Sequence, residues 1–177
     1  SDLEILVVDD GSEDNTCACV DRFRQVDARV RLIKQKHVGR MNAVFGGLKQ
    51  ANFACVGVLD ADGAVHPKEF EKLAPYLDRN VIVQGSRILR GDLPPIEGKP
   101  FYRRFFSLAL SYMFCLLFRV GVRDPQGAGF RLYLTETISP IIPNLRLKHD
   151  GMKDTEIIVR AYGQGIAIKE IPVRYTH

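Results

Sequence analysis

The chain has 177 residues, of which 46% are hydrophobic and 26% are charged, so it is long enough for one globular domain with a substantial core. Its net charge of +4 is too small to indicate a nucleic-acid-binding protein, but it suits anionic phosphates or an anionic membrane surface. No apolar run reaches the roughly 18 residues that a membrane span requires.

Strands and helices are expected to alternate along the first half of the chain. The apolar run 3–8 ends at Asp9-Asp10-Gly11-Ser12, and the apolar run 53–59 ends at Asp60-Ala61-Asp62-Gly63. Such transitions are typical of buried strands that meet turns. The predicted strands are 3–8, 30–33, 53–59 and 81–83, and the predicted helices are 15–26, 40–51 and 69–77, with Asp14 or Ser12 capping the first helix and Pro67 in the first turn of the third.

These strands are apolar throughout, not at every second residue, and Cys55 is therefore expected to be buried. The pattern predicts an α/β fold with a mainly parallel, Rossmann-like sheet and helices on both faces. Ligands of such sheets bind outside the carboxyl ends of the strands. Both acidic turns fall at such ends, so two strands are expected to direct carboxylates toward one crevice.

The second half of the chain has a different character. A strongly apolar helix is predicted over 101–119, a glycine-rich segment over 121–129, a helix over 154–162, and a final strand over 166–175 that is interrupted by Pro172. No linker separates two units, so the chain is predicted to be a single domain over residues 1–177. The apolar helix is more often a core helix than a membrane contact, although flanking arginines suit an interface.

The Asp60-x-Asp62 pair is the first candidate for chemistry. Two carboxylates on a tight turn suit a hard divalent cation such as Mg²⁺ or Mn²⁺, which takes oxygen ligands and commonly bridges to substrate phosphates. The alternative is a solvated turn, because Asp and Gly are common turn residues. At Asp9-Asp10-Gly11-Ser12 a carboxylate could accept hydrogen bonds from a base or a ribose, but alone this segment favours the turn.

Taken in order, the motifs resemble those of the family 2 glycosyltransferases, and in particular the subgroup of dolichyl-phosphate mannose and glucose synthases. The resemblance covers nearly the whole chain, and its specificity lies in the ordered set. The segments that carry it are Val7-Val8-Asp9-Asp10-Gly11-Ser12-Glu13-Asp14, Gly39-Arg40 with Ala43, Gly46-Gly47 and Ala51, Leu59-Asp60-Ala61-Asp62-Gly63, Gly85-Ser86-Arg87, Arg104 with Ser107, Asp124 with Gly129-Phe130-Arg131-Leu132-Tyr133, Asp154-Thr155-Glu156, and Glu170-Ile171-Pro172-Val173.

The resemblance implies a GT-A fold, a nucleotide-sugar donor carrying GDP or UDP, and inversion by direct displacement at the sugar. The subgroup implies a polyprenyl or dolichyl phosphate acceptor and a peripheral location at the cytoplasmic face of a membrane, on its surface or beside a membrane subunit. The implied partners include no nucleic acid. Four cysteines without metal-ligand spacing are read as reduced thiols, which agrees with the cytosol.

The resemblance also implies roles for individual residues. The implied donor-binding residues are Asp9, Asp10, Ser12, Arg40, Asp60 and Arg87, with Asp10 at the base; the metal ligands are Asp60 and Asp62; the acceptor-binding residues are Arg104, Ser107 and Arg131; and Asp124 is the catalytic residue, as a base or as a carboxylate beside the metal. A turn cap before Pro125 is the alternative for Asp124.

The chain departs from the family pattern at three places. It begins at the family's second strand and stops before the basic segment that usually follows the final strand, so the domain is expected to lack its first strand and to be incomplete at both ends. Ala64 stands where the subgroup often has a metal-binding Gln, and the segment from Asp124 to Gly129 is one residue longer than usual. Two other functions stay open: a family 2 enzyme that acts on a saccharide or another water-soluble acceptor, and a non-catalytic nucleotide-sugar-binding module.

Overall fold

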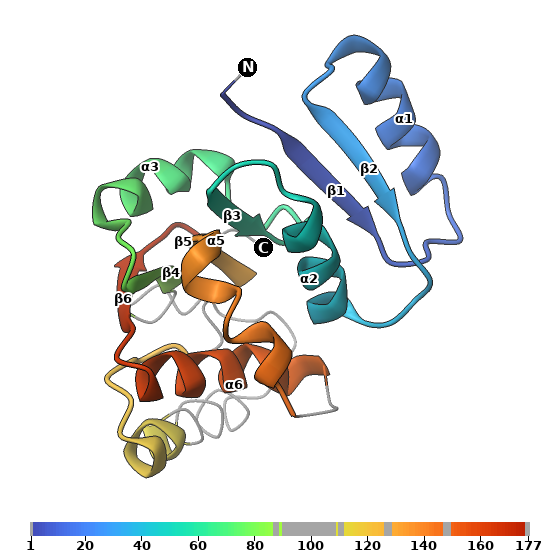
Figure 1. The fold of residues 1–177 in the computed structure, drawn as a ribbon. Coiled ribbons are helices and arrows are strands. Elements are labelled where there is room, and N and C mark those ends of the chain that lie inside the picture. Colours follow the sequence, from blue (N-terminus) through green and yellow to red (C-terminus); the bar gives the residue numbers. More distant parts are fainter. Residues whose placement is uncertain are drawn as a thin grey trace.

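The computed structural model of the chain describes residues 2–86, 89, 109, 112–125, 129–146 and 150–175. The predicted alternation of strands and helices is confirmed in the first half of the chain (Figure 1). The elements are β1 Ile5–Asp9, α1 Thr16–Val26, β2 Val30–Lys34, α2 Arg40–Gln50, β3 Cys55–Leu59, α3 Phe70–Leu73 between the 3-10 turns η1 Pro67–Glu69 and η2 Ala74–Tyr76, β4 Val81–Ser86, β5 Phe130–Leu134, α5 Thr135–Ile138, η4 Ile142–Asn144, α6 Asp150–Gly163 and β6 Ala167–Pro172.

The strands in the described part of the chain form two sheets, so the expectation of one mainly parallel sheet is wrong. β1 and β2 make a parallel pair, while the second sheet has the order β3-β5-β4-β6. In that sheet β5 runs antiparallel to both neighbours, and only β4 and β6 are parallel. The physical reason is that the segment from Phe130 onward is itself a strand, and its backbone pairs with β3 on one side and β4 on the other. Figure 1 shows α2 between the β1–β2 pair and the four-stranded sheet.

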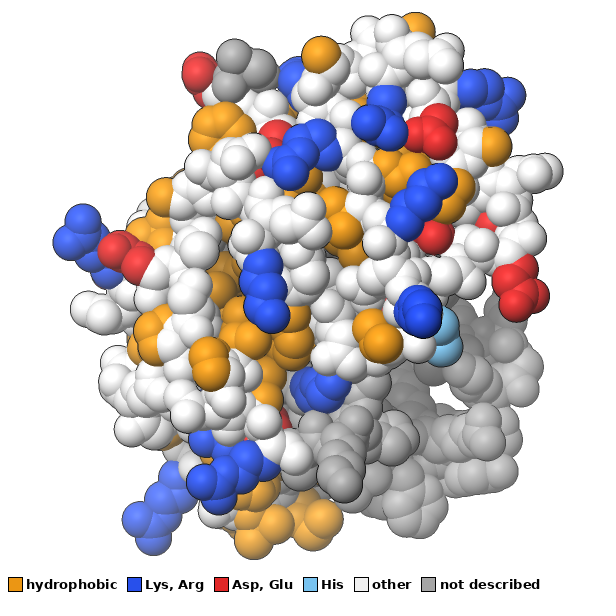
Figure 2. All heavy atoms as spheres, turned by 45° about the vertical axis from the view of Figure 1, so that its right-hand side comes forward, with side chains coloured by type: hydrophobic (Ala, Val, Ile, Leu, Met, Phe, Trp, Pro, Cys, Tyr) orange, Lys and Arg blue, Asp and Glu red, His pale blue; other side chains and the backbone are white. Residues whose placement is uncertain are grey.

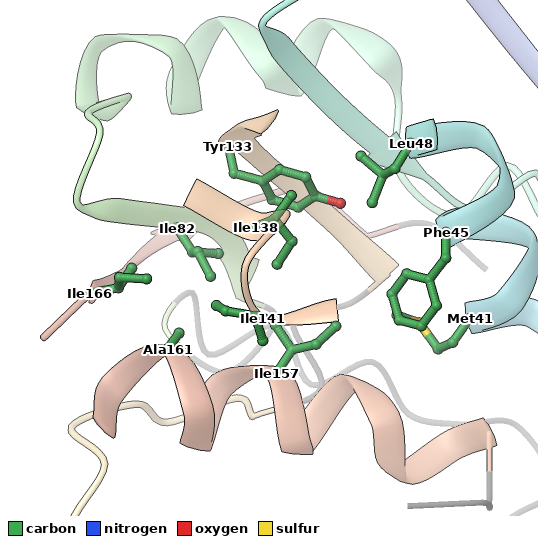
Figure 3. Packing of buried hydrophobic residues seen from close by; sticks show 10 residues of the cluster. All are labelled: Met41, Phe45, Leu48, Ile82, Tyr133, Ile138, Ile141, Ile157, Ala161 and Ile166. Atoms are coloured by element: carbon green, nitrogen blue, oxygen red, sulfur yellow. The ribbon is translucent and has the colours of Figure 1, made fainter. Parts of the chain in front are cut away.

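Helices cover both faces of the four-stranded sheet, as predicted. Ile82 and Val83 are consecutive residues of β4, both fully buried, and they point to opposite faces. Ile82 packs with α2 and α6, and Val83 packs with Leu73 of α3. Figure 3 shows the first of these layers, in which α2 and α6 direct apolar side chains toward the sheet. Its buried members are Met41, Phe45, Leu48, Ile82, Tyr133, Ile138, Ile141, Ile157, Ala161 and Ile166.

Three local expectations need correction. Cys55 is exposed: it is the first residue of β3, which among the described strands lies at the edge of its sheet and pairs only with β5. The helix expected over 69–77 is α-helical only in α3, with a 3-10 turn before it and another after it. Pro75, in the second turn, has no N–H to continue the α-helix. The N-cap of α1 is Asn15, which makes no side-chain capping bond, so the expectation of Asp14 or Ser12 as the cap is wrong. Asp14 lies one residue earlier, and its Oδ1 accepts the Thr16 N–H at 2.9 Å.

The described part of the predicted apolar helix is helical over residues 112–118. Five of its side chains are at least half exposed: Tyr112, Met113, Leu116, Leu117 and Phe118. Among the described residues, no helix has the length and apolar character to cross a bilayer. Figure 2 shows basic side chains scattered among apolar and uncharged surface on the face it displays, so the net positive charge is spread out there.

Candidate functional site

The turn after β1 is organised by Asp10. Its Oδ1 accepts hydrogen bonds from Gln35 Nε2 at 2.7 Å and from the Val38 N–H at 3.0 Å, and its Oδ2 accepts the Gly39 N–H at 2.9 Å. Burial alone would raise the pKa of Asp10, but these hydrogen bonds outweigh it and the pKa lies below its ordinary value. Asp10 therefore stays ionised and fixes the segment that leads into α2.

Asp9 is buried and stabilises its own turn. Its carboxylate accepts the Ser12 N–H at 3.3 Å, and hydrogen bonding from Ser12 lowers the pKa of Asp9. Ser12 itself is exposed. The structure shows that the carboxylates of Asp9 and Asp10 accept hydrogen bonds from nearby residues. Contacts of Asp9, Asp10 and Ser12 with a nucleotide stay predictions.

The second acidic turn, at the carboxyl end of β3, presents two accessible carboxylates. The Asp60 side chain is 34% exposed, and Asp62 is exposed. Asp62 Oδ1 accepts the Ala64 N–H at 2.9 Å, which shapes the turn. Within the described ranges, no group of three or more His, Cys, Asp or Glu gathers to hold a metal ion. Two carboxylates still fit Mg²⁺ or Mn²⁺, because such ions are commonly held by one or two carboxylates together with substrate phosphates and water.

An ion-pair network connects this turn to α2, α6 and β5. Arg40 Nε donates to Asp60 Oδ1 at 2.7 Å, and Arg40 Nη1 donates to Asp154 Oδ2 at 2.7 Å. The other oxygen of Asp154 accepts a hydrogen bond from Arg131. Burial would lower the pKa of Arg40, but Asp60 and Asp154 outweigh it and raise that pKa. The two arginines and two aspartates balance in charge, which suits their partly buried position.

The glycine-rich segment reaches the acidic turn through Gly129. Gly129 has φ +63°, and a side chain at this position would overlap the Asp60 carboxylate and lie 3.0 Å from Arg40 Nη2. A glycine is therefore required by both the backbone conformation and the close approach. This contact brings the segment predicted to carry the catalytic residue next to the predicted metal ligand.

Asp124 lies within that segment and is buried. It is 2% exposed; its N–H donates to Glu170 Oε1 at 2.8 Å, and its carbonyl accepts from Gln84 Nε2 at 2.7 Å. Arg131 is also buried and donates to Asp154, Gln84 and the Pro125 carbonyl. The structure thus joins Asp60, Arg40, Arg131 and the Asp124 segment in one connected arrangement.

Three predicted residues lie outside the described residues, namely Arg87, Arg104 and Ser107. Sequence reasoning missed the structural part played by three others, Gln84, Asp154 and Glu170. Gln84 could have been found, because it directly follows the apolar run 81–83 that was predicted as a strand, and a Gln buried there must satisfy its amide. For Asp154 and Glu170, which lie far along the chain from their partners, no local pattern indicates which groups they contact.

Comparison with protein families matches residues 1–138 to the model described as glycosyl transferase family 2. The chain is 31% identical over 181 residues to a dolichyl-phosphate beta-glucosyltransferase of Dictyostelium discoideum, covering 98% of this chain and 55% of that protein. It is 29% identical over 178 residues to the dolichyl-phosphate beta-glucosyltransferase ALG5C of Trichomonas vaginalis, covering 97% of this chain and 52% of that protein. The chain therefore spans about half the length of the curated relatives it matches.

Solved structures show the same fold at lower sequence identity. A glucosyl-3-phosphoglycerate synthase of Mycobacterium tuberculosis superposes with a TM-score of 0.63 at 16% identity, over 98% of this chain and 62% of that one. The synthase in complex with Mn²⁺, UDP-glucose and glycerol 3-phosphate gives a TM-score of 0.58, over 97% of this chain and 60% of that one. At this identity the similarity establishes the fold alone.

Proposed function

Because this chain belongs to glycosyl transferase family 2, we propose that it is part of an inverting hexosyltransferase that moves glucose from UDP-glucose to a dolichyl or other polyprenyl phosphate. The observation that carries this proposal is the placement of Asp60 and Asp62 at the carboxyl end of β3, beside Arg40. The names of the relatives support the sugar and the acceptor. The bound UDP-glucose of the structural neighbour supports the donor.

Asp60 and Asp62 would hold Mg²⁺ or Mn²⁺ together with the donor diphosphate. When bound, such a cation neutralises the negative charge that builds on the leaving diphosphate. Arg40 lies beside Asp60 and supplies a second positive charge at the same place. Asp10 accepts the N–H of Gly39, the residue directly before α2. Together with Asp9 and Ser12, it would bind the nucleoside part of the donor.

Asp124 would act on the acceptor side. An oxygen of the acceptor phosphate attacks the anomeric carbon while the bond from that carbon to the diphosphate oxygen breaks, so configuration inverts. A phosphate monoester is largely ionised near neutral pH, since its second pKa is roughly 6. Asp124 therefore orients the acceptor and accepts a remaining proton where one is present. Arg87, Arg104, Ser107 and Arg131 are proposed to serve the donor and acceptor phosphates, by the family pattern alone.

A peripheral membrane location at the cytoplasmic face is the third part of the proposal. Helical residues 112–118 expose Tyr112, Leu116 and Leu117, which are 74%, 68% and 70% accessible. Exposed apolar side chains of this size suit contact with lipid tails, and Arg119, exposed directly after them, suits a phosphate headgroup. A polyprenyl phosphate presents both kinds of surface, an apolar tail and an anionic head.

A donor screen tests the proposal. Thermal unfolding is measured with UDP, UDP-glucose, GDP and GDP-mannose, each with and without Mn²⁺, because a ligand that binds the folded state raises its stability. The expected result is a rise in Tm with UDP-glucose that requires Mn²⁺. A rise with GDP-mannose alone would contradict the glucosyl assignment. Binding of UDP-glucose without transfer to any acceptor would instead favour a non-catalytic module.

A further inference from the structure

Three polar side chains form a row across neighbouring strands of the four-stranded sheet. β5 pairs with β4 so that Arg131 lies opposite Gln84, and β4 pairs with β6 so that Gln84 lies opposite Glu170. Residues paired in this way point to the same face of a sheet. On that face, two residues along β4 and β6, lie Ile82 and Ile168, which belong to the apolar layer beneath α2 and α6. We call Arg131, Gln84 and Glu170 the polar row.

The polar row binds the backbone N–H and carbonyl groups of residues 123–125. Glu170 accepts the Arg123 N–H with Oε2 at 2.6 Å and the Asp124 N–H with Oε1 at 2.8 Å. Gln84 Nε2 donates to the Asp124 carbonyl at 2.7 Å, and Arg131 donates to the Pro125 carbonyl at 3.5 Å. Because Pro125 has no N–H, every backbone polar group from the N–H of Asp124 to the carbonyl of Pro125 has a partner in the row.

The other end of the row reaches the acidic turn. Arg131 pairs with Asp154, Asp154 pairs with Arg40, and Arg40 pairs with Asp60. A continuous chain of hydrogen bonds and ion pairs therefore runs from the backbone of Asp124 to the carboxylate of Asp60. Gln84 is fully buried and Arg131 is 5% exposed, so an apolar residue would cost less at either position if the strands needed only to pack.

We propose that Gln84 and Glu170 are positioning residues that hold Asp124 at a fixed place relative to Asp60. The inference rests on the proposed function, in which the two carboxylates serve opposite sides of the transferred sugar. Displacements of about 1 Å in such arrangements lower turnover by roughly 10²-fold. Glu170 contributes most, because one carboxylate fixes two consecutive N–H groups.

The informative variant is Glu170→Gln in the full chain. The glutamine amide has only one oxygen, so it can accept from only one of the Arg123 and Asp124 N–H groups. Its NH₂ group would face the other N–H, and two donors repel each other. Turnover is expected to fall by roughly tenfold to 10²-fold, with the KM for the donor unchanged. The matched control is Glu136→Gln, since Glu136 is a surface residue, 56% exposed, paired with Arg79. The control is expected to keep wild-type kinetics.

A double-mutant cycle with Asp124→Asn separates positioning from a general loss of folding. If Glu170 acts through Asp124, Glu170→Gln lowers turnover little further once Asp124 is Asn. Equal loss in both backgrounds, or wild-type turnover in Glu170→Gln, would overturn the inference.

Amide hydrogen exchange gives a readout that needs no substrate. Glu170→Gln is expected to speed exchange at Arg123 and Asp124 while amides of β4 keep wild-type rates. Unchanged exchange at Arg123 and Asp124 would overturn the inference. Failure of the proposed function has a different signature, because the wild-type chain and Glu136→Gln would then both lack transfer activity.

Discussion

Gly129 and Asp60 approach so closely that no side chain fits between them. Gly129 has φ +63°, and a Cβ there would overlap Asp60 Oδ2. The contact joins the glycine-rich segment after Asp124 to the acidic turn after β3. It therefore places the last residue of that segment directly beside the predicted metal ligand.

Gly129→Ala is expected to displace Asp60 and to weaken Mn²⁺-dependent donor binding by roughly tenfold or more, a loss of about 1.4 kcal/mol. The control is Gly165→Ala, because Gly165 has φ +77° but nothing within 4 Å of the added methyl group. Both variants carry the cost of a left-handed conformation, about 1–2 kcal/mol of stability. Calorimetric titration and thermal unfolding check this, and equal loss of donor binding in the two variants would contradict it.

Asp62→Asn is expected to retain the fold and to lose metal-dependent donor binding. The Asn side-chain oxygen can still accept the Ala64 N–H, so the turn keeps its shape while one anionic ligand is removed. Affinity for UDP in the presence of Mn²⁺ should fall by roughly tenfold or more.

The control for Asp62→Asn is Asp78→Asn. Asp78 makes the same kind of bond two residues ahead, to the Asn80 N–H at 3.1 Å, at an exposed turn away from the site. If calorimetry shows undiminished UDP affinity with Mn²⁺ in Asp62→Asn, the metal assignment is wrong.

Asp124→Asn is expected to lower turnover by roughly 10²-fold if the carboxylate acts as a base, with donor affinity little changed. The backbone bonds of Asp124 to Glu170 and Gln84 do not involve its side chain, so they are expected to survive the change. Steady-state kinetics with varied donor and acceptor measure the effect. Near-normal turnover would show that the Asp124 side chain has no part in catalysis and serves only the turn before Pro125.

Leu116→Ser together with Leu117→Ser is expected to weaken binding to anionic vesicles. Burial of one Leu side chain contributes about 1.5–3 kcal/mol, so the double variant should lose at least tenfold in vesicle affinity. Phe23→Ser is the control, since Phe23 is 65% exposed on α1. Co-sedimentation with anionic vesicles measures the bound fraction of each protein, and only the double variant is expected to bind less than the wild type. Equal binding by the wild type, the double variant and the control would place residues 112–118 away from the membrane.

Local patterns in the sequence predicted the individual elements of the first half well. The apolar runs before Asp9 and Asp60 are β1 and β3, and the helix after Gly39 begins at Arg40. The sheet arrangement was not predictable in the same way. β5 joins β3 and β4 through backbone pairing between segments about 70 and 50 residues apart along the chain, and no local periodicity encodes that pairing.

In the candidate site, too, some residues could be predicted from local sequence patterns, and the contacts between them could not. Asp60 and Asp62 were predictable because a pair of carboxylates after an apolar run is a local feature. The link from Asp60 through Arg40 to Asp154 was not, since Arg40 and Asp154 lie 114 positions apart along the chain. Likewise, Gln84 and Glu170 meet Asp124 only because β4 and β6 are aligned in register.

A transfer assay shows whether the chain moves glucose to a lipid phosphate. The chain is incubated with radiolabelled UDP-glucose, Mn²⁺ and dolichyl phosphate in detergent, and the lipid fraction is extracted and treated with α- and β-glucosidases to identify the linkage. The expected product is a labelled β-linked glucosyl lipid whose formation requires both the divalent cation and the lipid phosphate, and which Asp62→Asn does not form. Transfer of label to water-soluble saccharides but not to lipid, or an α-linked product, would contradict it.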